Sequence, residues 1–383
     1  MPVDRMLPDE DARDLIGLVR DIAAGSLAPG VEAAELHGVF PREEFRVLGR
    51  AGLLGMTAPQ EYGGAELSQE VYLQAVEELG AVWMSVAVGV SVHTLSCWAL
   101  VAHGTPEQRE RLLPGMIGGE QLGGFMLSEL QAGSDVAAIS TRAVPTDGGW
   151  LVNGAKAWIT HGGEADFYTL IARTSDDGPR GLSCFLLPGD APGLVALPAE
   201  RKMGLKASRT SQVLLQDVPL AADRLIGAPG DGMRLAMAAL DRGRLGIAAA
   251  ATGLAQAALD HAVGYARDRE QFGRPIGEFQ GVSFLLAEMA ARVESARATY
   301  LAAARRCDAG LPFSRASAVA KLVATEAAMQ VTTDAVQVLG GAGYTLDHPV
   351  ERYMREAKVT EIFEGTSQIQ KLVIGRRLLT DSP

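Results

Sequence analysis

A single carboxylate near the C-terminus is the residue best placed to do chemistry. Glu364 lies in the segment TEIFEGTSQIQ (360–370), between Phe363 and Gly365 and just before a stretch typical of a helix. A solvated helix cap is one interpretation of this residue. The other is a general base, because an apolar neighbour dehydrates a carboxylate and raises its pKa toward neutral pH. Gly365 would then let the chain turn closely around a bound ligand.

Signatures of several other functional classes are absent from the sequence. It contains no G-x-x-x-x-G-K, G-x-G-x-x-G or G-x-S-x-G segment, and its six histidines form no H-x-x-x-H pair. Three scattered cysteines (Cys97, Cys184 and Cys307) fit neither a disulfide framework nor a zinc site. The net charge is −11 without a basic block, which argues against a nucleic-acid partner. The acidic N-terminus has no signal-like apolar core, so we expect a cytoplasmic protein.

Five segments stand out together along the chain. They are MLSELQAGSD (126–135), GAKAWITHGG (154–163), RDREQFGRPIGEFQ (267–280), DAVQVLGGAGY (334–344) and IFEGTSQIQKL (362–372). In this order and spacing they resemble the acyl-CoA dehydrogenase family, most closely its short-chain, medium-chain and short branched-chain members. The resemblance covers nearly the whole chain. It implies FAD as cofactor and the oxidation of an acyl-CoA thioester to the trans-2-enoyl-CoA.

The resemblance also implies which residues contact FAD. They are Phe125, Leu127, Ser128, Ser134, Trp158, Thr160, Arg269, Phe272, Gln280, Gln337, Gly341, Thr366 and Gln368. Arg269, Phe272 and Gln280 match positions that reach the cofactor of a neighbouring subunit. Arginine and backbone N–H groups suit the diphosphate, and hydroxyl groups suit the flavin ring. Taken singly, Ser134 also fits a turn cap, Trp158 a strand core and Arg269 a surface charge.

By the same resemblance, Glu364 is the base that removes the α-proton while a hydride passes from the β-carbon to flavin N5. Ser134, Asp241, Arg244 and Gly365 match positions around the thioester, although Asp241 and Arg244 also fit an exposed ion pair on a helix. Some relatives carry the base on that helix instead, where this chain has Gly243.

The sequence departs from the family pattern at a few positions. Leu130 and Gln131 replace a proline and a small residue near the thioester, His161 replaces an asparagine, and Phe363 replaces a common tyrosine. The first of these departures leaves the acyl preference open.

A homotetramer, with an electron-transferring flavoprotein as electron acceptor, is expected from the family alone. Three alternatives stay open: the same chemistry on a carrier-protein thioester, an oxidase that uses oxygen, and an acyl-CoA-binding flavoprotein without dehydrogenase activity.

Sequence patterns predict the elements that must position these residues. Helical patterns up to residue 121 include a capping box at Thr105–Gln108. Short apolar runs from 122 to 228, with turn signals at Asp147–Gly149 and Asn153–Gly154, predict a β-barrel-like domain. Long helical patterns from 229 to 383, broken at Gly273–Pro275, predict a four-helix bundle. The expected class is therefore α+β with three domains, 1–121, 122–228 and 229–383, in the acyl-CoA dehydrogenase fold.

One apolar segment is long enough to span a membrane. Residues 82–104 contain no Asp, Glu, Lys or Arg. The segment also contains His93, His103 and several hydroxyl residues, and no positively charged residues flank it. We therefore expect a buried helix and no membrane partner.

Overall fold

Helices make up the first part of the chain in the computed structural model, which describes residues 3–380. They are α1 (Glu10–Ile22), α2 (Val31–His37), α3 (Arg42–Arg50), α4 (Gln69–Val82), α5 (Met84–His103) and α6 (Pro106–Ile117). The predicted capping box starts α6: Thr105 Oγ1 accepts from the Gln108 N–H at 3.2 Å, and Gln108 Oε1 accepts from the Thr105 N–H at 2.8 Å. Two of the orphan N–H groups at this helix start are thereby satisfied.

Helix α5 forms from the apolar segment 82–104. Among residues 3–380 it is the one helix whose length and composition would allow a membrane span, but 83% of its most apolar window is buried inside the protein. It packs against α4, α7 and strand β1. The expectation of a buried helix is confirmed.

The middle of the chain forms one eight-stranded sheet. Its strands are β1 (Gly123–Met126), β2 (Arg142–Thr146), β3 (Gly149–Thr160), β4 (Phe167–Arg173), β5 (Leu182–Pro188), β6 (Leu194–Ala196), β7 (Thr210–Ala221) and β8 (Leu225–Ile226). The order is β6-β7-β3-β2-β4-β5-β8, and β1 pairs in parallel with β4. Buried residues of β7, such as Val213, Leu215 and Val218, belong to the sheet's own hydrophobic cluster, and the alternation is broken by two exposed residues between Leu215 and Val218.

One of the two predicted turns in this region is wrong. The chain reverses at Asp147–Gly148, between β2 and β3, as expected. Asn153 and Gly154 instead lie inside β3, where the pairing with β7 shifts register between Val152 and Gly154. Gly154 has φ +153°, and a β-carbon there would crowd Thr141. The Asn-Gly pair therefore marks a β-bulge, which uses the same conformational freedom as a hairpin turn.

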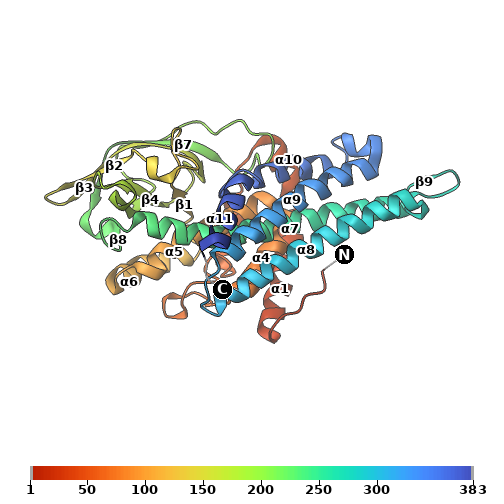
Figure 1. The fold of residues 1–383 in the computed structure, drawn as a ribbon, viewed down its shortest axis with the longest axis horizontal. Helices are drawn as coiled ribbons and strands as arrows, with labels where there is room; N and C mark the ends of the chain where they lie inside the picture. Colours follow the sequence, from red (N-terminus) through yellow and green to blue (C-terminus); the bar gives the residue numbers. More distant parts are fainter. Residues whose placement is uncertain (1–2, 381–383) are drawn as a thin grey trace.

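Long helices return after the sheet. They are α7 (Gly232–Asp268), α8 (Gln280–Asp308), α9 (Ser314–Leu339), α10 (Val350–Thr360) and α11 (Ser367–Thr380). The predicted break at Gly273–Pro275 is the short hairpin of β9 (Glu270–Gln271) and β10 (Arg274–Pro275). Figure 1 shows the sheet at one end of the molecule and this hairpin projecting at the other, with α7 and α8 running between them. The expected α+β fold, with helical, β and helical parts in that order, is present.

The predicted domain limits fall in connections between elements. Position 121 lies between α6 and β1, and position 228 lies between β8 and α7. The limits themselves stay predictions.

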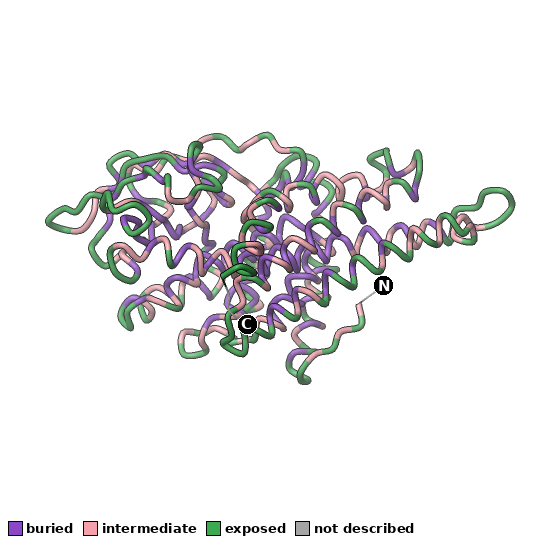
Figure 2. Tube along the Cα trace, in the orientation of Figure 1, coloured by how far each residue is buried: buried purple, intermediate pink, exposed green. Residues whose placement is uncertain are grey.

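The main hydrophobic core is shared by helices from both ends of the chain. It includes Leu73 and Val76 of α4, Val86 of α5, Leu254 of α7 and Val331 of α9, all fully or almost fully buried. In Figure 2 the buried trace is concentrated where these helices cross, and the β9–β10 hairpin is exposed. The N-terminal and C-terminal helices therefore form one packed body.

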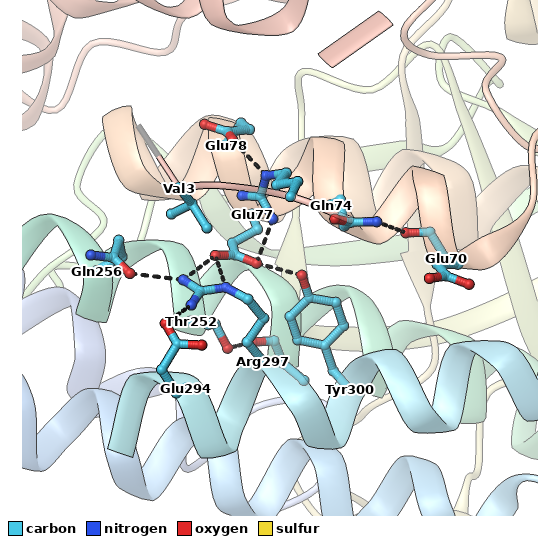
Figure 3. A network of polar contacts seen from close by, with 12 residues as sticks. Val3, Glu70, Gln74, Glu77, Glu78, Thr252, Gln256, Glu294, Arg297 and Tyr300 are labelled. Atoms are coloured by element: carbon cyan, nitrogen blue, oxygen red, sulfur yellow. Dashed lines mark hydrogen bonds and ion pairs between the residues drawn. The ribbon is translucent and has the colours of Figure 1, made fainter. Parts of the chain in front are cut away.

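A buried polar network lies inside this body (Figure 3). Glu77 of α4 accepts from Arg297 of α8 at 2.8 and 3.0 Å, from Arg5 at 3.1 Å and from the Tyr300 hydroxyl. Arg297 also donates to Gln256 of α7 at 2.8 Å. The network links three helices and the segment that precedes α1.

Candidate active site

A cavity of about 630 Å³ lies where the sheet meets α5, α7, α10 and the start of α11. Most of the residues predicted to contact the cofactor or the substrate line this cavity. They are Phe125, Leu127, Ser128, Ser134, Trp158, Thr160, Arg244, Glu364, Gly365 and Thr366. Residues that are more than 200 positions apart in the sequence thus line the same cavity.

Glu364 occupies the turn between α10 and α11. Its φ is +53° and that of Gly365 is +91°, so two successive residues adopt left-handed backbone conformations. This turn directs the Glu364 side chain into the cavity, where Oε2 is buried and has no hydrogen-bond partner within residues 3–380. A solvated helix cap is therefore the wrong interpretation.

Burial raises the pKa of Glu364 to about 7, while the nearby cations of Arg244 and Lys321 act in the opposite direction. A carboxyl group with this pKa exchanges protons readily near neutral pH, as a general base must. The apolar residues Phe363 and Val359 line the cavity beside Glu364.

Gly243 of α7 lies directly against the Glu364 carboxylate. A β-carbon on Gly243 would lie 2.9 Å from Glu364 Oε2 and 3.3 Å from its Cδ. The two positions therefore converge on one point in space. An acid side chain at position 243 would therefore reach the place that the Glu364 carboxylate occupies, and any side chain there would compete with Glu364.

Asp241 and Arg244 form a buried ion pair on α7. Arg244 Nη1 lies 2.6 Å from Asp241 Oδ1, and their side chains are only 7% and 16% exposed. The hydroxyl of Ser314 donates to the same Asp241 oxygen at 3.1 Å. Arg244 lines the cavity, and its buried Nε has no hydrogen-bond partner within the described residues. The exposed-pair interpretation is thus wrong for both residues, and Asp241 holds Arg244 from behind without lining the cavity itself.

Strand β3 presents Trp158 to the cavity. The pairing of β3 with β7 shifts register between Lys156 and Ile159, and Trp158 has φ +61°. As a result its side chain turns out of the strand and is 58% exposed. The strand-core interpretation of Trp158 is therefore wrong.

The loop after β1 is fixed to β3 by a buried ion pair. Lys156 Nζ donates to Glu129 Oε1 and to the Leu127 carbonyl, both at 2.9 Å, and both charged side chains are almost fully buried. The Ala157 N–H donates to the Ser128 carbonyl at 2.9 Å. These contacts set the position of Leu127 and Ser128 relative to Trp158, so the cavity wall is rigidly built.

This wall fits a flat aromatic cofactor. The indole of Trp158 offers a large face, and the hydroxyls of Ser128 and Thr160 make no hydrogen bond within the described residues. A ring system with hydrogen-bond donors and acceptors at its edge would satisfy them.

Six predicted cofactor residues do not line the cavity of their own chain. Arg269 and Phe272 lie in and beside the β9–β10 hairpin and Gln280 begins α8; all three are exposed, Phe272 to 93%. Gln337 and Gly341, near the end of α9, are also exposed, as is Gln368 at the start of α11. The predicted cofactor contacts of these six residues stay predictions. For Arg269, Phe272 and Gln280, the predicted contact is with the cofactor of a second subunit.

Sequence reasoning missed the segment that connects β6 to β7. Within residues 197–209, Lys202, Met203 and Gly204 line the cavity, and Arg355 of α10 donates to the Met203 carbonyl at 2.9 Å. A β-carbon on Gly204 would lie 2.6 Å from the Arg355 carbonyl carbon, so only glycine allows this close approach. The cluster of basic residues in RKMGLKASRT was the available signal.

Comparison with known proteins identifies the family to which this chain belongs. The models described as acyl-CoA dehydrogenase N-terminal, middle and C-terminal domain match residues 9–120, 124–218 and 230–379. The chain belongs to the acyl-CoA dehydrogenase family. It is 42% identical over 364 residues to an acyl-CoA dehydrogenase of Bacillus subtilis, which covers 94% of this chain and 96% of that protein. It is 41% identical to the short-chain specific acyl-CoA dehydrogenase of Clostridium acetobutylicum, with the same shares covered.

Two solved structures superpose over almost the whole chain. The butyryl-CoA dehydrogenase of Megasphaera elsdenii gives a TM-score of 0.96 at 39% identity, over 98% of this chain and all of that one. A structure described as the electron transferring flavoprotein of Acidaminococcus fermentans gives 0.96 at 40%, over 99% and 100%.

Two more distant structures bear on the cofactor and the substrate. The FAD complex of PigA gives a TM-score of 0.93 at 26% identity, over 99% of this chain and 100% of that one. The prolyl acyl carrier protein oxidase AnaB gives 0.94 at 28%, over 97% and 100%.

Proposed function

We propose that Glu364 is the base with which this acyl-CoA dehydrogenase removes the α-proton of its substrate. The observation that supports the proposal is the buried Glu364 Oε2, which lines the cavity and has no hydrogen-bond partner within the described residues. An acyl thioester bound in the cavity would bring its α-carbon to this oxygen. Because the pKa of Glu364 is raised to about 7, the same group can hold the proton that it receives.

The residues of the cavity fit FAD as the cofactor, and the likeness to the FAD complex of PigA supports it. Trp158 would lie beside the flavin ring, and Ser128, Thr160 and Thr366 would bond its edge. When bound, FAD supplies the acceptor for the hydride that leaves the β-carbon. The chain's own part is to hold the thioester between this ring and Glu364, to exclude water with Phe363, and to keep the abstracted proton on Oε2.

The Glu364→Gln variant tests the proposal. Glutamine keeps the size of the side chain but cannot accept the α-proton, so we expect yellow protein with wild-type FAD content and a loss of flavin reduction by acyl-CoA of at least about 10³-fold. Anaerobic stopped-flow absorbance measures the reduction. A variant that reduces its flavin at the wild-type rate would exclude Glu364 as the base.

The substrate is a short acyl-CoA in this proposal. The support is the similarity to relatives described as short-chain specific and butyryl-CoA dehydrogenases. The test measures the rate of flavin reduction by a panel of saturated CoA thioesters of increasing length and branching. Acyl groups of four to six carbons should reduce the flavin about 10-fold faster than long-chain acyl groups. Faster reduction by long-chain thioesters would contradict it.

A carrier-bound thioester is the second candidate substrate, because of the likeness to the prolyl acyl carrier protein oxidase AnaB. The departures at Leu130 and Gln131 lie in the loop 127–134 that borders the cavity, where a carrier arm would pass. Comparing reduction by one acyl group on CoA and on a carrier protein separates the two. Hydrogen peroxide formed in air during turnover would identify an oxidase.

Two assembly features belong to the same proposal. We infer a homotetramer in which the β9–β10 hairpin of one subunit, with Arg269 and Phe272, reaches the cofactor of another; the exposure of both residues supports this. An electron-transferring flavoprotein as acceptor is supported by the similarity to the Acidaminococcus fermentans structure. Arg269→Ala should then lower FAD retention although Arg269 lies outside its own chain's cavity.

A further inference from the structure

Lys321 of α9 is buried directly against the turn that carries Glu364. Its side chain is completely buried, and Nζ donates a hydrogen bond of 2.8 Å to the Gly365 carbonyl. No ion pair joins this ammonium group to a carboxylate within 4.0 Å among residues 3–380. A buried charge without such a partner is costly, and chains keep one where its charge is used.

The hydrogen bond alone does not explain a lysine at this position. The amide of Gln370 in α11 already donates to the same Gly365 carbonyl at 2.8 Å, and to the Glu364 carbonyl at 3.3 Å. A neutral donor therefore suffices to hold the turn. What Lys321 adds is a positive charge.

The charged groups around the turn show where that charge acts. Glu364 and Glu361 attract the Lys321 ammonium group and Arg244 repels it. Arg244 is already paired with Asp241 at 2.6 Å. Lys321 is therefore a cation beside Glu364 that no other carboxylate neutralises at close range. Its pKa is lowered to about 8 by burial, so it is charged at neutral pH.

We propose that Lys321 is a positioning residue for the base: it anchors Gly365 and its charge keeps the Glu364 carboxylate ionised when substrate arrives. The proposal rests on the proposed role of Glu364. Neither ligand contact nor direct proton transfer is assigned to Lys321, since it lines no part of the cavity. It acts through the electrostatic field at Glu364 and through the turn's geometry.

Two variants separate the charge from the hydrogen bond. Lys321→Gln keeps a donor toward Gly365 but removes the charge, and Lys321→Met removes both. One nearby positive charge lowers a carboxyl pKa by about one unit or more. We therefore expect the acid limb of the flavin-reduction rate in Lys321→Gln to move up by about one pH unit, with about 10-fold slower reduction at pH 6 and a nearly unchanged rate at pH 9. In Lys321→Met we expect the same shift with a lower plateau.

A second readout is independent of turnover. The infrared band of a protonated carboxyl group, taken as the difference between each protein and its Glu364→Gln counterpart, should titrate about one unit higher in both Lys321 variants. Two controls apply. Lys371→Gln removes an exposed lysine of α11 that pairs with Glu326, and should shift neither readout. Gln370→Leu removes the neutral donor and should leave the titration unshifted.

The outcomes distinguish this proposal from the one on which it rests. If Glu364→Gln abolishes reduction but Lys321→Gln leaves both the acid limb and the infrared titration in place, only the role of Lys321 is overturned. If Glu364→Gln reduces its flavin normally, the base assignment fails first. Loss of folded, FAD-containing protein in both Lys321 variants would show that the lysine serves folding, which also overturns the proposal.

Discussion

At the scale of single residues, the proposed role of Glu364 rests on a carboxylate oxygen that has no hydrogen-bond partner within the described residues. Most buried polar atoms in proteins are hydrogen-bonded, so an unpartnered oxygen such as Glu364 Oε2 needs an explanation. Other protein groups come close without satisfying it: Gly243 on one side, and the field of Arg244 and Lys321 on the other. In the proposed function, this oxygen receives the α-proton of the substrate.

The Gly243→Ala variant tests how tightly this oxygen is placed. The new methyl group would lie 2.9 Å from Glu364 Oε2, closer than normal carbon–oxygen contact, and so would displace the carboxylate by a few tenths of an ångström. We expect flavin reduction to slow by about 10-fold, because proton transfer depends steeply on distance. Gly264→Ala is the matched control in the same helix, since no atom lies within 4 Å of its added methyl group. Equal rates for both variants would mean that the carboxylate adjusts freely.

At the scale of elements, helix α7 owes its position to two glycines at its contact with α4, Gly253 of α7 and Gly80 of α4. A β-carbon on Gly253 would overlap the Glu77 carbonyl oxygen and lie 2.8 Å from the Ala81 nitrogen, and one on Gly80 would lie 2.6 Å from the Ala250 carbonyl oxygen. The two backbones therefore approach as closely as glycine permits. Since α7 carries Gly243 and Arg244, this contact also fixes one wall of the cavity.

Replacing Gly253 by alanine should destabilise the protein. Overpacking a tight contact typically costs 1–3 kcal/mol, so we expect a loss of about 2 kcal/mol in the free energy of unfolding, measured by urea denaturation followed by circular dichroism. Gly264→Ala again serves as the reference, where a helical glycine with open space around it should lose no stability. A Gly253→Ala variant as stable as Gly264→Ala would show that the helices separate at little cost.

Sequence patterns anticipated elements and motif residues better than tertiary contacts. The long helices and the α6 cap follow from local periodicity and capping patterns, and the site residues of the five segments follow from the family resemblance. Lys321 and the Lys156–Glu129 pair did not, because burial of a charge is decided by strands and helices distant in the chain. Each lysine stands alone in an otherwise uncharged run, AVAKLVAT and GAKAW, which is the only local signal. The Asn153–Gly154 bulge was missed because its partner strand begins more than 50 residues later.

At the scale of the whole molecule, the Glu77 network joins the segment before α1 to three helices of the shared core (Figure 3). Burial alone would raise the pKa of Glu77, but the cations of Arg5 and Arg297 hold it below its ordinary value. A carboxyl group with a lowered pKa stabilises the folded state above its unfolded pKa near 4.5. That contribution is lost as the pH falls through the folded pKa.

Arg297→Met should expose this dependence. Removing one partner of a buried ion pair costs about 3 kcal/mol, so we expect a loss of that size in the free energy of unfolding at pH 7. The loss should shrink as the pH falls through the folded pKa of Glu77 in the variant, because the protonated carboxyl group no longer needs the missing cation. Arg305→Met, on the same helix but in an exposed pair with Glu70, should cost less than about 1 kcal/mol at either pH. A loss that does not change with pH would argue for lost packing instead.

The unbroken length of α7 has a consequence for how this chain can vary. The helix has 37 residues and is about 55 Å long. The part from the cavity wall at Gly243 to the start of the projecting hairpin at Arg269 covers about 39 Å of this length. Adding or deleting one residue between these ends would rotate the far end by about 100° about the helix axis and point the hairpin in another direction. Substitutions between Arg244 and Arg269 can therefore accumulate. An insertion or deletion there would change the orientation of the hairpin relative to the cavity wall.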